Sequence, residues 1–166
     1  AEQIRNDVDY HSLPVTIVNV GSGISYGNLG YSHHSIQDYA LMRTMPNLLI
    51  ASPSNKEQVK KSMKYLLSNP QPSYLRLSKS KIEKNAEKNT ETSSLKPGLW
   101  NCIHKGNSKN IILFTGDTHE KAKSILNDSN YKNYSLYSLT IWGMKYKKLQ
   151  IQQAKRWKKI LILEDH

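Results

Sequence analysis

The residues most able to do chemistry gather between Gly21 and His34, in the stretch GSGISYGNLGYSHH. Glycines at 21, 23, 27 and 30 let the backbone turn sharply and let a ligand approach it closely. His33 and His34 follow at once, and an imidazole can act as a general acid or base near neutral pH. A helix is expected to begin near His33, so its free N–H groups would favour an anionic or oxyanionic group at the loop.

The same stretch argues against several familiar sites. The loop does not fit G-x-G-x-x-G and no Walker lysine follows it, so neither a dinucleotide fingerprint nor a P-loop is indicated. On a helix, His33 and His34 would diverge by about 100°, so they could not form the i, i+4 pair of a metal site. One of them can face a ligand; the alternative is a histidine that only caps or packs. Cys102 and His104 form C-x-H without companions, so no metal site is expected.

The elements that must position this loop follow from the apolar spacing. Strands are expected over 14–20, 47–51 and 72–78, and helices over 33–45 and 54–69. The first strand is rich in β-branched residues and is expected to be buried, and Ser54 with Glu57 would form a capping box on the second helix. Strands that alternate with helices at short spacing favour parallel pairing with right-handed crossovers, which is an α/β fold.

A second patterned region follows a polar stretch. Residues 79–97 have almost no apolar side chains and are expected to form a linker. Beyond it, strands are expected over 110–116, 134–140 and 159–164, and helices over 119–128 and 149–157. The sequence therefore predicts two incomplete α/β units with mainly parallel sheets, residues 1–78 and 98–166, joined by the linker.

The charge is uneven along the 166 residues. The chain has 24 Lys and Arg against 13 Asp and Glu, a net charge of +11, of which +2 falls on residues 1–78 and +9 on residues 79–166. A basic half suits nucleic acid or an anionic surface. The lysines are scattered, however, and do not interleave with aromatic residues, so a solvated lysine-rich surface is favoured and nucleic acid is not expected as a partner. A non-catalytic module that binds nucleic acid or another anion is the alternative, and steep salt dependence of binding would reveal it.

The cellular setting is inferred from absences in the sequence. No run approaches the roughly 20 apolar residues that span a bilayer, and no signal peptide is evident. The single cysteine, Cys102, cannot form an internal disulfide. We therefore expect a soluble protein in the reducing cytoplasm. Because the sequence starts at Ala1 in a helix-like stretch and stops after a strand-like run, we expect a fragment of a longer chain.

Five segments resemble the pyrimidine-binding domain of the transketolase family of thiamine diphosphate enzymes, in the same order and at the same spacing. These are EQIRNDV, YHSLPV, YGNLGYSHHSIQD, MRTMPNLLIASPSN and PSYLRLSK. The likeness is greatest to the split, small-subunit transketolases, and the region from KPGLW to LILEDH resembles the family's C-terminal domain more loosely. The resemblance implies a transferase of carbohydrate metabolism that moves a two-carbon ketol unit between sugar phosphates. Deoxyxylulose-phosphate synthase, in the same superfamily, is the alternative.

The resemblance also implies roles for residues of the loop. His33 matches the histidine of G-x-T/S-H, which lies beside the reactive thiazolium and hydrogen-bonds donor-sugar oxygens, so it would be catalytic and substrate-binding. The cofactor-binding residues implied are Gly27, Asn28, Gly30 and Ser32, which would shape the loop.

Two basic residues near the end of the third expected strand would bind the substrate. Lys79 corresponds to a basic residue, often arginine, that contacts the sugar phosphate, and Arg76 is a second candidate. An exposed charge with no ligand is the alternative for both, since lysine binds phosphate only as a point charge. Leu29 stands where larger transketolases have an acid that orients donor hydroxyls.

The resemblance finally implies what this section of the family lacks. The glutamate that activates thiamine diphosphate, and the aromatic residues around its pyrimidine, would precede Ala1. The site for the diphosphate and its Mg²⁺ belongs to another domain. We therefore expect the chain to be inactive alone, to hold no metal, and to need a transketolase N-terminal (diphosphate-binding) domain or subunit, in a dimer or heterotetramer.

Overall fold

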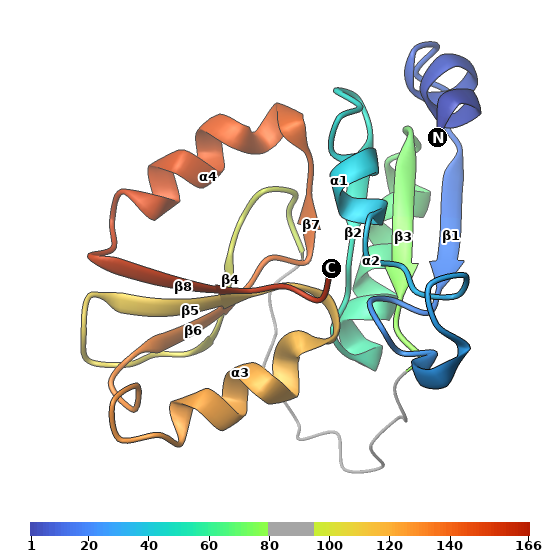
Figure 1. The fold of residues 1–166 in the computed structure, drawn as a ribbon. Coiled ribbons are helices and arrows are strands. Elements are labelled where there is room, and N and C mark those ends of the chain that lie inside the picture. Colours follow the sequence, from blue (N-terminus) through green and yellow to red (C-terminus); the bar gives the residue numbers. More distant parts are fainter. Residues whose placement is uncertain (80–94) are drawn as a thin grey trace.

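The computed structural model describes residues 1–79 and 95–166, and within these ranges the strands form two four-stranded sheets (Figure 1). The first sheet has the order β1 (Thr16–Val20), β3 (Ser73–Leu77), β2 (Leu49–Ala51) and β7 (Ile141–Trp142). The second has the order β4 (Asn101–His104), β6 (Ser135–Ser138), β5 (Asn110–Phe114) and β8 (Lys159–Leu163). In each sheet one strand, β7 or β4, pairs antiparallel and the other described pairings are parallel. The α/β prediction with mainly parallel sheets is confirmed.

Both faces of the first sheet carry an apolar core. On one face, Ile50 and Tyr74 pack with the short helix α1 (Asp38–Met42). On the other, Leu75 packs with helix α2 (Lys56–Ser68), whose Leu66 is buried. Asn55 caps α2 by accepting a hydrogen bond from the amide of Gln58, so the expected capping box at Ser54 is wrong by one residue. The polar side chain of Asn55 satisfies an amide of the first turn that has no partner within the helix.

The second sheet packs mainly against helix α3 (His119–Leu126), and helix α4 (Lys147–Ala154) precedes β8. Phe114 of β5 and Ala122 of α3 are fully buried in this core. Short 3₁₀ segments, Gly116–Thr118 and Met144–Tyr146, lead into α3 and α4. The strand and helix expected around each of these elements are therefore present within a few residues of their predicted bounds.

The two sheets meet through contacts between residues far apart in the sequence. Strand β7 lies beside β2, so a strand from the later half completes the first sheet (Figure 1). The buried Gln58 of α2 donates to Ser138 and accepts from Thr140 at 3.0 Å. Leu95 lies in the same core as β2 and β3. The proposed division into 1–78, 79–97 and 98–166 stays a prediction, and most of the expected linker lies outside the described residues.

Two further local expectations from the sequence were wrong. Strand β1 is not buried but lies at the edge of its sheet, where Val18 and Val20 are more than half exposed. The helix expected over 33–45 begins at Asp38, not near His33, and follows an N-terminal π-helix at Ile4–Asp9. The amide of Ser35 bonds to the carbonyl oxygen of Gly23 at 2.9 Å and so does not join a helix. The two histidines therefore lie in a turn that precedes the N-terminus of α1.

Candidate active site

The glycine-rich segment forms a loop that is closed at its base. Gly23 and Ser35 exchange backbone hydrogen bonds of 3.1 and 2.9 Å, and Gly23 has a positive φ of 56°. These two residues define the neck of the loop, and residues 24–34 form the loop itself. All of the cofactor-binding residues implied by the resemblance, and both histidines, lie in this loop between the two sides of the neck.

His33 presents an exposed imidazole whose orientation is fixed by its neighbour. Its Nδ1 lies 3.0 Å from Oγ of Ser32, and that hydroxyl donates to the carbonyl oxygen of Leu29 at 3.4 Å. Since a hydroxyl has one hydrogen, the bond to Leu29 leaves Oγ to accept from the Nδ1–H of His33. The neutral ring then carries its lone pair on Nε2, which is the atom free to take a proton.

His34 has a structural contact instead. Its Nε2 lies 2.9 Å from the carbonyl oxygen of Gly27, and a carbonyl can only accept, so the ring donates. Gly27 begins a short 3₁₀ turn, Gly27–Leu29, with a φ of 54°. His34 thus ties the second half of the loop to the first, while His33 stays available for a ligand.

Tyr26 stands between two of the predicted site residues. Its ring centroid is 5.7 Å from that of His33, and the ammonium of Lys79 lies 4.5 Å from the same centroid. Gly21 makes this position possible, since an added Cβ there would come within 2.0 Å of the Tyr26 ring. The structure therefore brings His33 and the exposed Lys79 to one aromatic ring, a relationship that the sequence did not reveal.

Arg76 lies beneath the loop and is 1% exposed. Its Nε donates to Asp38 and its Nη1 to Asp165, both at 2.6 Å, while its Nη2 donates to the carbonyl oxygen of Ser35 at 2.8 Å. Longer bonds of 3.3 Å reach the Tyr39 hydroxyl and the backbone oxygen of Asp165, so all five N–H groups have an acceptor. The signal in the sequence was a charge inside the apolar strand YLRL, which requires buried carboxylates nearby.

The charges around Arg76 shape the ionisation of this buried cluster. Although burial by itself would lower the pKa of Arg76, Tyr39, Asp165 and Asp38 raise it above its ordinary value, so the guanidinium stays charged. Burial raises the pKa of Tyr39 to about 12, against the opposing effect of Arg76. Burial, and then the carboxylate of Asp38, raise the pKa of Tyr74 as well. Both phenols therefore stay protonated as hydrogen-bond donors across the physiological range.

The predicted site residues thus fall into two groups. Gly27, Asn28, Gly30, Ser32 and His33 share the loop, and Lys79 joins them through Tyr26. Arg76 is separate, because protein acceptors surround its guanidinium below the neck. Its predicted contact with a sugar phosphate, like the other residue roles, stays a prediction.

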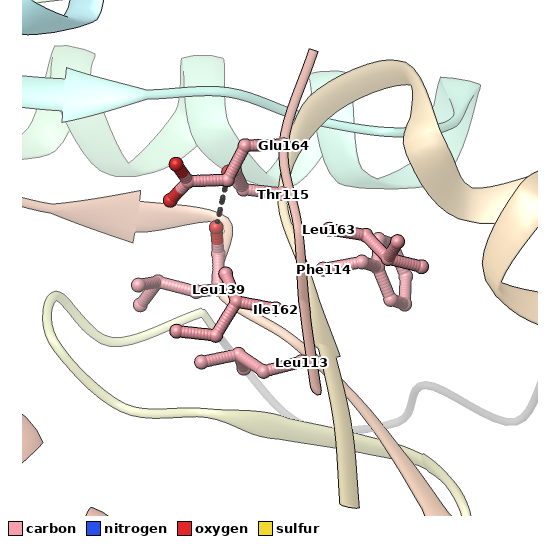
Figure 2. Close-up of a pocket in the computed structure, with 7 residues that line it drawn as sticks. All are labelled: Leu113, Phe114, Thr115, Leu139, Ile162, Leu163 and Glu164. Atoms are coloured by element: carbon pink, nitrogen blue, oxygen red, sulfur yellow. Dashed lines mark hydrogen bonds between the residues drawn. The ribbon is translucent and has the colours of Figure 1, made fainter. Parts of the chain in front are cut away.

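A small pocket elsewhere in the molecule contains none of these residues. It lies where β5 and β8 end and is mostly apolar (Figure 2). Its lining residues are Leu113, Phe114, Thr115, Leu139, Ile162, Leu163 and Glu164. The Thr115 hydroxyl donates to the carbonyl oxygen of Leu139 at 2.8 Å, as Figure 2 shows, so it is already engaged within the protein. Glu164 also has a partner, His166 Nε2 at 2.5 Å.

The loop and strands β1, β2 and β3 lie in a region that matches a known domain. The family described as "Transketolase, pyrimidine binding domain" matches residues 1–84, about half of the chain. The chain belongs to the transketolase family. The expectation drawn from the five sequence segments is therefore confirmed at the level of the family.

Individual transketolase relatives match parts of the chain. One subunit of an apulose-4-phosphate transketolase from Phocaeicola vulgatus is 37% identical over 81 residues, which are 49% of this chain and 26% of that protein. A 1-deoxy-D-xylulose-5-phosphate synthase of Thermus thermophilus is 29% identical over 113 residues, 68% of this chain and 18% of that protein. The chain thus spans about a quarter or less of these two relatives.

A solved transketolase structure has a fold similar to that of this chain. It is titled "Split gene transketolase, inactive beta4 tetramer", and it superposes with a TM-score of 0.75 at 24% sequence identity. The match covers 99% of this chain and 52% of that one. Both sheets of this transketolase-family chain are therefore found together in a known transketolase fold.

Neither a metal cluster nor a membrane-spanning helix is found in the described residues. In the part of the chain that the structure describes, no three His, Cys, Asp or Glu side chains gather where they could hold a metal ion. Among the helices of residues 1–79 and 95–166, none is long and apolar enough to cross a membrane.

Proposed function

We propose that this chain is the pyrimidine-binding and C-terminal section of a transketolase that transfers a two-carbon ketol unit between sugar phosphates with thiamine diphosphate. The observation that carries the proposal is the exposed imidazole of His33, oriented at Nδ1 by Ser32 within the segment that matches the family. An imidazole with a free Nε2 suits reactions in which sugar oxygens exchange protons.

The loop offers room for the cofactor's organic part. An added Cβ at Gly27 or Gly30 would meet, among the described residues other than its chain neighbours, no atom within 4 Å, so a ligand can approach the backbone closely there. Thiamine diphosphate, when bound, supplies the carbon nucleophile and the electron sink for breaking a carbon–carbon bond. The residues Asn28 and Ser32, with the two glycines, would hold the reactive end of the cofactor beside His33.

The described residues of this chain do not form a site for Mg²⁺. They contain no cluster of His, Cys, Asp or Glu side chains that could hold a metal ion. In the proposed enzyme the diphosphate and its metal would be held by the partner domain or subunit.

In the proposed reaction, His33 moves protons at sugar oxygens. Its Nε2 accepts the proton of a donor-sugar hydroxyl as the adjacent carbon–carbon bond breaks. It returns a proton to the acceptor's carbonyl oxygen when the new bond forms, so the imidazole ends in its starting state. General acid–base contributions of this kind are worth about a hundredfold or more in rate.

Lys79 is the better candidate for the substrate's phosphate. It is exposed, and the Tyr26 ring holds its ammonium on the same side of the molecule as the loop. Lysine attracts phosphate as a point charge without demanding one geometry. Arg76 would act on the substrate only indirectly, because its five donors already bond to the protein.

The partner is a polypeptide that carries the diphosphate-binding domain. One relative is named as a subunit of a transketolase, and a structure with this fold is titled an inactive β4 tetramer of a split-gene transketolase. These names support a dimer or heterotetramer in which this chain is inactive until it meets its partner. A cytoplasmic location remains part of the same proposal.

Calorimetry with and without a diphosphate-binding transketolase subunit tests the proposal. With Mg²⁺ present, the chain alone should bind thiamine diphosphate more weakly than micromolar, and the mixed subunits should bind tightly and transfer ketol units. Micromolar binding by the chain alone would contradict the division of the site. Formation of 1-deoxy-D-xylulose 5-phosphate by the mixture would favour the synthase alternative, and salt-sensitive binding of DNA or RNA near physiological salt would favour the nucleic-acid alternative.

A further inference from the structure

We propose that Asp165 is a positioning residue that holds the neck of the His33 loop, so that the C-terminal segment controls the geometry of the site. This inference rests on the proposed function for its kinetic consequence, but the contacts that carry it are structural. The C-terminus lies between the two sheets, close to α1 (Figure 1). Asp165 is thereby brought to Arg76, which precedes it by 89 residues.

Asp165 forms an ion pair with Arg76. The Arg76 side chain is wholly buried, and that of Asp165 is 17% exposed. One oxygen of the carboxylate accepts from Nη1 at 2.6 Å, and the backbone oxygen of Asp165 accepts from Nη2 at 3.3 Å. Two acceptors from one residue orient the guanidinium plane as well as attract its charge.

Arg76 in turn bonds to Ser35, on one side of the neck. Nη2 donates at 2.8 Å to the carbonyl oxygen of Ser35, the same oxygen that accepts the amide of Gly23. Asp38, the first residue of α1, accepts a hydrogen bond of 2.6 Å from Nε of the same guanidinium. The group that Asp165 orients is therefore bonded directly to the neck.

Asp165 also lies directly against Gly23, on the other side of the neck. An added Cβ on Gly23 would lie 2.6 Å from the backbone oxygen of Asp165 and 3.3 Å from its Cβ. Gly116, in the 3₁₀ segment after β5, is also close, since an added Cβ there would be 3.2 Å from a carboxylate oxygen of Asp165. Asp165 thus packs on one side of the neck and, through Arg76, bonds to the other.

Together these contacts predict what Asp165 does for the loop. Removing its carboxylate would leave a buried N–H of Arg76 without its charged acceptor, and the guanidinium would reorient toward Asp38. The bond from Arg76 to Ser35 would then weaken, and the Gly23–Ser35 neck would open more often. Because residues 24–34 depend on that neck, His33 would lose its fixed position.

Hydrogen exchange on the full chain tests whether Asp165 holds the loop, without any assay of activity. Amides 24–34 in Asp165→Ala should exchange about tenfold or more faster than in the wild type, with amides of β5 and β6 unchanged. Asp165→Asn keeps an acceptor of the same shape without the charge. Its loop amides should exchange at a rate between those of the wild type and Asp165→Ala. The matched control is Asp117→Asn, because Asp117 also links the two halves of the molecule, by accepting from the Ser78 hydroxyl at 2.6 Å, but does not bond to the neck.

A kinetic readout separates positioning from simple stability. In the assembled enzyme, Asp165→Ala should lower kcat for ketol transfer about tenfold or more with a smaller change in KM, and Asp165→Asn should restore part of kcat. Unchanged loop exchange in Asp165→Ala, equal acceleration in Asp117→Asn, or an unchanged kcat per assembled enzyme would overturn the inference. If the wild-type assembly transfers no ketol units, the proposed function fails, and the exchange experiment alone decides whether Asp165 holds the loop.

Discussion

Arg76 and Asp38 form an ion pair of 2.6 Å in which the arginine side chain is wholly buried and the aspartate side chain is 10% exposed. The two residues belong to β3 and to the start of α1, so the pair fixes the helix against the sheet. A charge in such a place is tolerated only while its partners remain. Its removal therefore has a large and measurable effect.

Arg76→Met should lower the free energy of unfolding by about 3–5 kcal/mol, because it leaves the carboxylates of Asp38 and Asp165 buried without a cation. Denaturation in urea measures this loss. The control is Arg43→Met at an exposed arginine, for which a change within about 0.5 kcal/mol is expected. Similar small changes in both variants would show that the buried network contributes little.

Stability should also fall in alkali because of Tyr39. Its pKa is raised by burial to about 12, from an ordinary value of 10.0. Below pH 10 the phenol is protonated in both the folded and the unfolded protein, so its ionisation does not change the free energy of unfolding. Between pH 10 and 12 only the unfolded state loses the proton, so the free energy of unfolding should drop by about 1.4 kcal/mol per pH unit for this group.

Unfolding curves recorded from pH 9 to 12 measure this dependence. The slope should be smaller in Tyr39→Phe, which has no proton to lose, although that variant is also less stable at pH 8 because Arg76 and Ser52 lose a partner. Identical slopes in the two proteins would contradict the assignment to Tyr39.

Gly21→Ala should displace the Tyr26 ring. Gly21 has a φ of 102°, and a Cβ there would come within 2.0 Å of the ring. Gly27→Ala is the matched control, because its φ is also positive but, apart from its chain neighbours, no described residue has an atom within 4 Å of the added Cβ. The control should cost about 1–2 kcal/mol from the backbone alone, and Gly21→Ala should cost more.

Tyrosine-specific NMR measures the ring itself. The Tyr26 resonance, assigned with Tyr26→Phe, should shift in Gly21→Ala and stay in place in Gly27→Ala. Equal costs and an unmoved resonance in both variants would show that Gly21 does not make room for the ring.

The sequence predicted the strands of the fold better than the surroundings of its loop. Parallel strands such as β3 and β5 were evident because their apolar runs are bounded by polar turns. The burial of β1 was mistaken, because β-branched residues favour strands at the edge of a sheet as well as at its centre. The two-residue strand β7 has too few residues for any periodicity to show.

The candidate site was predictable only in part. His33 and the glycines are adjacent in sequence, so a local pattern could find them. Asp165 lies 89 residues from Arg76, and no local pattern reports a contact made by the tertiary fold. The helix expected at His33 failed for a similar reason, because the Ser35 amide found an acceptor across the neck, at Gly23.

The central claim is that His33 takes part in ketol transfer while its neighbour His34 only supports the loop. Both imidazoles lie next to each other in the loop, but Nε2 of His34 is bonded to Gly27, whereas the hydrogen bond of the His33 ring to Ser32 is made at Nδ1. The most direct test is kcat/KM for ketol transfer in the assembled enzyme carrying His33→Ala or His34→Ala. We expect His33→Ala to lower kcat/KM by about a hundredfold or more, and His34→Ala mainly to weaken loop stability or assembly. Equal and small losses in the two variants would contradict the role assigned to His33.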